Sequence, residues 1–77
     1  MDKIEIAKKR IEIVRLRNLA NWQRGDYAQS YRRQAEHPIY AGQEDICRAK
    51  AMHAQGLAAT NDMMADLLQA EIEEGLK

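Results

Sequence analysis

The stretch HPIYAGQED, residues 37–45, holds the only proline of the chain and separates two long segments of similar character. Pro38 disfavours helix at His37, and Gly42 offers a permissive backbone position before the Gln-Glu-Asp sequence of a new helix. On both sides, Ala, Leu, Ile and charged residues recur at helical spacing, without the alternation of a strand. We therefore expect one all-α domain, an antiparallel two-helix hairpin. Its expected elements are a helix over residues 2–36, a turn over 37–42 and a helix over 43–75.

Each expected helix carries a stripe of mostly small or apolar residues whose spacing alternates between three and four. When the chain folds back at the proline, the two stripes face each other, with Asn18 opposite Asn61 and Gly25 opposite Ala54. Such a buried polar pair can specify the register at some loss of stability. The first stripe is Ile4, Ala7, Ile11, Val14, Asn18, Asn21, Gly25 and Ala28, and the second is Cys47, Ala51, Ala54, Ala58, Asn61, Ala65, Leu68 and Ile72.

The stretch NWQRGDYAQ, residues 21–29, allows two interpretations of the first helix. In a continuous helix, Gly25 on the seam would let the two backbones approach closely. Alternatively, the helix kinks or breaks here, because Gly costs ~1 kcal/mol relative to Ala inside a helix. Asp26 followed by Gln29 also resembles a capping box for a new helix. Both interpretations stay open.

A chain of 77 residues buries a core that is small for an independent fold. A second apolar stripe is expected opposite the seam on each helix, and a lone hairpin would leave both stripes in water. We therefore expect a homodimer that forms a four-helix bundle. The expected dimer face is Ile6, Ile13, Leu16, Ala20, Met52, Met63 and Leu67.

Basic residues follow the first stripe closely, although the formal net charge of the chain is zero. Lys3, Arg10, Arg17 and Arg24 recur every seven residues, as in a rail that binds phosphates. In the expected register, however, Arg10 comes near Glu71 and Arg15 comes near Asp62. Such pairs neutralise each other, so nucleic-acid binding is the less favoured interpretation of these charges.

The sequence contains no motif of an enzyme or of a metal site. His53 and Cys47 are six residues apart, which places them on different sides of a helix, and HExxH, CxxC and phosphate-binding loops do not occur. We expect neither catalysis nor a metal nor a cofactor, and Cys47 is expected to be a small buried residue. The first residues lack the apolar core of a signal peptide, and no apolar run approaches the ~20 residues that cross a bilayer. These features predict a cytoplasmic protein without a membrane partner.

All four aromatic residues lie between positions 22 and 40, among several arginines. Trp, Tyr and Arg dominate the hot spots of protein interfaces, which predicts a partner-binding patch at the turn end. Alternatively, the rings cover the Ala-rich start of the second helix. The residues of the expected patch are Trp22, Arg24, Tyr27, Tyr31, Arg32, Arg33 and Tyr40.

These features together favour a small non-catalytic protein-binding module, such as an adaptor, regulator or inhibitor. It would act by presenting a helical face to a partner protein, and its size and composition are typical of a bacterial or bacteriophage accessory factor. Two alternatives come from other classes. One is a nucleic-acid-binding protein that uses the basic first helix, and the other is a structural subunit of a larger assembly.

Overall fold

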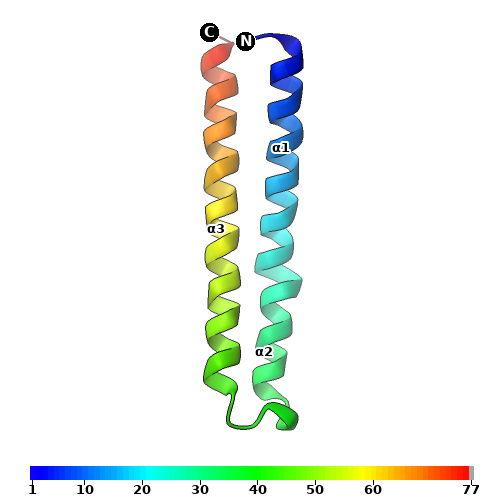
Figure 1. The fold of residues 1–77 in the computed structure, drawn as a ribbon, viewed down its shortest axis with the longest axis vertical. Helices are drawn as coiled ribbons and strands as arrows, with labels where there is room; N and C mark the ends of the chain where they lie inside the picture. Colours follow the sequence, from blue (N-terminus) through cyan, green and yellow to red (C-terminus); the bar gives the residue numbers. More distant parts are fainter. Residues whose placement is uncertain (77) are drawn as a thin grey trace.

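A computed structural model describes residues 1–76 and shows two long helical arms, antiparallel and side by side (Figure 1). The all-α hairpin expected from the sequence is confirmed. The first arm consists of α1 (Lys3–Trp22), a π-helical segment η1 (Gln23–Tyr27) and α2 (Ala28–Glu36), and the second arm is α3 (Glu44–Gly75). The short 3-10 helix η2 (Pro38–Tyr40) lies in the turn, and the start of α1 and the end of α3 lie at the opposite end of the rod.

Local signals set the ends of the arms. The Asp2 carboxylate caps α1 by accepting a 2.8 Å hydrogen bond from the backbone N–H of Glu5. At the turn, His37 is extended (φ −83°, ψ 134°), because the following Pro38 excludes the helical conformation there. Gly42 then takes φ +88°, a left-handed conformation that favours glycine, and α3 begins two residues later.

The α3 side of the seam agrees with the sequence expectation. Its heptad stripe is buried along the whole arm, with Asn61 and Leu68 half-buried. Five of the buried positions are alanine or cysteine, so little bulk separates the two arms. The fully or largely buried members of the stripe are Cys47, Ala51, Ala54, Ala58, Ala65 and Ile72.

The α1 side of the seam differs from the expectation. Ile4, Ile11 and Val14 are 67%, 70% and 59% exposed, so the predicted first stripe lies outside the hairpin except for Ala28. The buried residues are Ile13, Leu16, Ala20, Gln23, Ala28 and Ala35, of which only Ala28 belongs to the predicted stripe. The observed seam buries the large side chains of Ile13 and Leu16 and leaves Asn18 exposed to water. The predicted seam would have removed Asn18 from water.

The π-helical segment explains why the true seam was missed. The inward positions of the first arm are three or four residues apart up to Gln23, but the next buried residue is Ala28, five positions on. A helix that continued as α would turn Ala28 about 100° away from the position it needs. One extra residue accommodated in η1 restores the phase, so that Ala28 and Ala35 face α3.

Two further expectations are corrected by this geometry. Ile13, Leu16 and Ala20, expected on a dimer face, are buried between the arms, and Ile6 packs against the cluster of Ile13 and Leu16. The helix passes Gly25 without a break, but a Cβ added there would meet no atom within 4 Å beyond the backbone of its own helix, so no close backbone approach occurs at this glycine. Met52, Met63 and Leu67 do lie on the outside, as expected.

Candidate functional site

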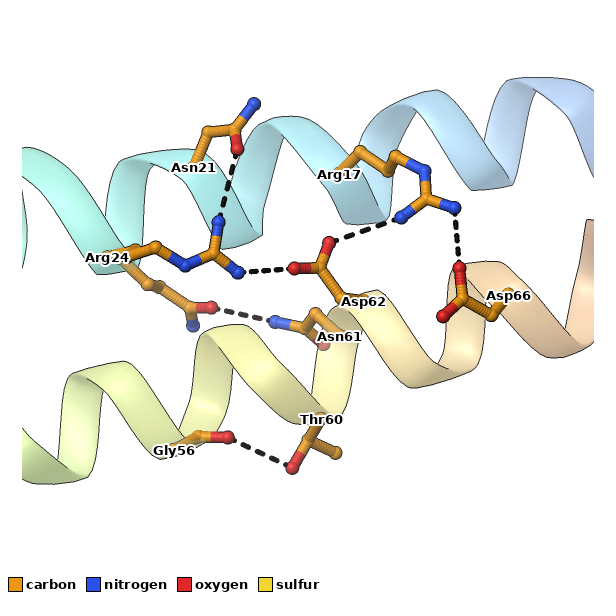
Figure 2. Close-up of polar contacts among 9 residues, drawn as sticks. Arg17, Asn21, Arg24, Gly56, Thr60, Asn61, Asp62 and Asp66 are labelled. Atoms are coloured by element: carbon orange, nitrogen blue, oxygen red, sulfur yellow. Dashed lines mark hydrogen bonds and ion pairs between the residues drawn. The ribbon is translucent and has the colours of Figure 1, made fainter.

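One side of the hairpin carries a network of ion pairs between the arms (Figure 2). Arg17 contacts Asp66 at 2.7 Å and Asp62 at 3.4 Å, and Arg24 pairs with the other oxygen of Asp62. Arg24 also donates a 3.4 Å hydrogen bond to Asn21. The hydrogen bond to Asp66 is the main cause that raises the pKa of Arg17 above its ordinary value. Two members of the basic rail are thus neutralised within the chain.

Arg15 and Glu71 form ion pairs with other partners than those predicted from the sequence. Arg15 bonds Glu12 of its own helix, with 2.9 Å between Nε and Oε2, and this hydrogen bond lowers the pKa of the Glu12 carboxyl. Glu71 pairs with Lys9 rather than with Arg10. These partners differ from the prediction because α1 turns a different stripe toward α3, so that different residues of α1 lie beside α3.

A polar pair does cross the seam, but it is not the predicted pair. The Asn61 side-chain nitrogen donates a 2.8 Å hydrogen bond to the side-chain oxygen of Gln23. Gln23 is only 8% exposed and is the single buried polar side chain of the described residues. It lies at the start of η1, so the polar pair marks the position along the rod at which the first arm changes phase.

Aromatic side chains form a ladder beside η1. The rings of Trp22 and Tyr27 are 4.8 Å apart, and Tyr27 meets Tyr31 edge-on at 5.1 Å. Their hydroxyl oxygens are 3.2 Å apart, and this hydrogen bond raises the pKa of Tyr27. Lys50 of α3 lies 5.5 Å from the centre of the Tyr31 ring.

The two tyrosines have the covering role that was the alternative to a binding patch. Both pack against the alanine cluster of Ala28, Ala51 and Ala54 at the turn end of the seam. Bulky rings thereby supply the apolar contact that small side chains do not provide.

The seven residues of the predicted partner patch are not gathered on one surface. Arg24 belongs to the ion-pair network, and Trp22, at the start of the aromatic ladder, is about half exposed. Arg33 and Tyr40 line an open cavity of about 440 Å³ between α2 and the turn. Arg32 lines a separate hollow together with Arg48 of α3.

One exposed row of apolar residues at helical spacing is the row that sequence reasoning had assigned to the core. Ile4, Ala7, Ile11 and Val14 recur at steps of three and four on the outer side of α1, and all are exposed. We call this row the Ile11 stripe. It is flanked by basic residues on both edges: Lys3, Lys8, Arg10 and Arg15.

Within the described residues, no group of three or more His, Cys, Asp or Glu side chains could hold a metal ion. Cys47 is a free thiol buried in the seam. Across residues 1–76, no helix combines the length and the apolar character needed to cross a membrane.

Comparisons with known proteins complete this description. No family model, curated protein or solved structure matches the chain. The residues of this chain are therefore the guide to its function.

Proposed function

We propose that the chain is a non-catalytic protein-binding module that presents the Ile11 stripe to a partner protein, and that it does so as a homodimeric four-helix bundle. The observation that carries the proposal is the row of large apolar side chains held outside a well-formed helix, with Ile11 70% exposed. Rows of this kind at steps of three and four are how a helix docks into an apolar groove or against another helix.

Energetics indicate what such a partner must look like. Covering Ile4, Ile11 and Val14 contributes roughly 1.5–3 kcal/mol for each side chain. Association itself costs about 4–15 kcal/mol, so three aliphatic contacts alone leave little net affinity. Lys3, Lys8 and Arg10 beside the stripe supply the rest when the partner's groove has an acidic rim, which also speeds encounter, whereas Arg15 is paired with Glu12.

This surface suits an adaptor, regulator or inhibitor that works by occupying a partner. Arg17 and Arg24 are held by Asp62 and Asp66, which takes them away from a continuous track for phosphates. A protein groove is therefore favoured over nucleic acid as the surface that the Ile11 stripe meets.

The test is an affinity pull-down of the tagged chain from a lysate of the organism that encodes it, with and without nuclease. Ile11→Glu places a charge in the middle of the stripe, and Met52→Glu is the matched control on α3, because the two side chains are 70% and 71% exposed. Circular dichroism of both variants checks that helix content is unchanged.

We expect a protein partner that survives nuclease, is retained by Met52→Glu and is lost with Ile11→Glu. Equal recovery with the two variants would reject the Ile11 stripe as the binding surface. Recovery that disappears with nuclease would instead support the nucleic-acid alternative.

A further inference from the structure

A second apolar region, bordered by charged residues, lies on the side of the hairpin opposite the network of Arg17, Arg24, Asp62 and Asp66. An open groove of about 330 Å³ runs between the arms here, lined by Leu16, Leu68, Leu67, Met64, Glu12 and Glu71. Residues seven positions apart share a face of a helix, so Leu57 and Lys50 continue the row of Met64 on α3. On the first arm, Leu19 continues the row of Glu12. We call this surface the Leu57/Met64 face.

The α3 row of this face has an order that complements itself. It reads Lys50, Leu57, Met64, Glu71, with a basic end, two apolar residues in the middle and an acidic end. When the same row from a second chain runs in the opposite direction, Leu57 meets the partner's Met64, and Lys50 meets the partner's Glu71. Within each chain Glu71 also pairs with Lys9, so in the dimer its carboxylate is shared by two lysines. A row running in the same direction would place like charges together.

The first arm supports the same centre of symmetry. Gln23 and Asn61 lie at one level of the rod, and the midpoint of the α3 row lies beside Asn61. Reversal about this level brings Leu19 opposite the partner's Tyr27, two apolar side chains that are both half-buried. Tyr27 is eight rather than seven residues after Leu19, and the extra residue of η1 keeps the two on one face.

The length of the rod accommodates an interface of standard size. The Cα atoms extend 56 Å along the rod and 14 Å across it, so the Cα outline of a broad side, charged residues included, measures about 780 Å². Specific interfaces bury about 800 Å² on each partner. A second copy centred on the middle of the rod covers the whole side, whereas a copy centred near one end would cover only part of it.

We infer that two copies of this chain pack through their Leu57/Met64 faces with their turns at opposite ends, α3 against the partner's α3. This inference rests on the proposed function in one respect: it assigns the interface of the homodimer proposed there. In this arrangement the Ile11 stripes stay outside the bundle, so each dimer offers two of them.

Disulfide formation between chosen positions tests both the face and the direction. In a Cys47→Ala background, the double variant Leu57→Cys/Met64→Cys is oxidised, and each single variant is treated in the same way. Within one chain, the two positions are ~10.5 Å apart along the helix, beyond the Cα separation of a disulfide. The matched control is Met52→Cys/Ala59→Cys, with the same spacing on the α3 row that contains Asp66.

We expect a covalent dimer from the double variant and little from either single variant or from the control pair. Analytical ultracentrifugation of the unaltered chain should give twice the single-chain mass of 8.9 kDa. A single-chain mass at high protein concentration would overturn the inference. A dimer that cross-links through the control pair, or through Leu57→Cys alone, would equally overturn it.

A charge exchange gives a second measurement. In a Lys9→Ala background, which removes the ion pair of Glu71 within its own chain, Lys50→Glu or Glu71→Lys alone should weaken dimerisation about threefold to tenfold. The double exchange should recover most of the affinity, and a double variant no tighter than the single variants would contradict the reversed arrangement. These experiments use the purified chain without its partner, so their failure would leave the dependence of partner binding on Ile11 as a separate result.

Discussion

Deleting Gly25 should leave the hairpin at least as stable as before, although a deletion inside a helix normally turns its two halves out of register. The inward positions of the first arm, with half-buried Tyr31 counted between Ala28 and Ala35, are spaced by three or four residues except between Gln23 and Ala28. Removal of one residue from η1 changes that interval from five to four, so an ordinary α-helix then places every buried side chain toward α3. Because no side chain is lost, the core stays intact.

The expected magnitude follows from the two contributions that change. Gly costs ~1 kcal/mol relative to Ala inside a helix, so its removal should raise the free energy of unfolding by up to ~1 kcal/mol. Against this, α2 slides by at most ~1.5 Å along α3, a fraction of one helical turn. The matched control is deletion of Ala59, an exposed residue in the middle of α3.

The Ala59 deletion should be severely destabilising. It turns one half of α3 by about 100° and removes either the Leu68 and Ile72 layers or the Cys47 and Ala51 layers from the seam. When the Leu68 and Ile72 layers are lost, exposure of the buried Ile72 side chain alone costs about 1.5–3 kcal/mol, and half-buried Leu68 adds to this cost. Urea unfolding followed by circular dichroism, at several protein concentrations, measures both variants. If the Gly25 deletion loses as much stability as the Ala59 deletion, η1 is not the element that restores the phase.

Four further single substitutions and one double substitution have clear expectations. Gly42→Ala should destabilise the hairpin by ~1–2 kcal/mol, because Gly42 has φ +88°. Gly25→Ala, with open space around it, should stabilise the hairpin by up to ~1 kcal/mol. Thermal melts measure both variants. Hydrogen bonds from the backbone N–H groups of Glu44 itself and Gly42 lower the pKa of the Glu44 carboxyl. Its contribution is therefore complete above the ordinary carboxyl pKa and lost as the pH falls through the lowered value, and Glu44→Gln should reduce the loss of stability on acidification. Asn61→Leu alone should lower the free energy of unfolding by ~1–3 kcal/mol, because the buried Gln23 amide loses its partner. Replacing both Gln23 and Asn61 with Leu should raise the melting temperature measured by calorimetry.

The turn and the second arm were predictable from sequence because each depends on local or strictly periodic signals. Pro38 and Gly42 act on their own backbone, and the α3 stripe keeps its heptad spacing from Cys47 to Ile72. A periodic pattern and a single turn are sufficient for an antiparallel hairpin.

The seam of the first arm was not predictable from a strict repeat. That arm carries two apolar stripes, and the one with the unbroken heptad, through Ile4 and Ile11, lies outside. The buried stripe contains a one-residue offset after Gln23, which a search for a pattern that resumes one position late would have found. The exposed Ile11 stripe was missed for the same reason, because its residues had been placed in the core.

The position of the chain ends has a consequence for anything attached to them. The start of α1 and the end of α3 lie at one end of a rod whose Cα atoms extend 56 Å, and the turn lies at the other. In the reversed dimer that we propose, domains fused to the two chains would therefore be held apart by nearly the full length of the rod. Such a bundle would act as a rigid spacer, keeping two attached cargoes at a constant separation.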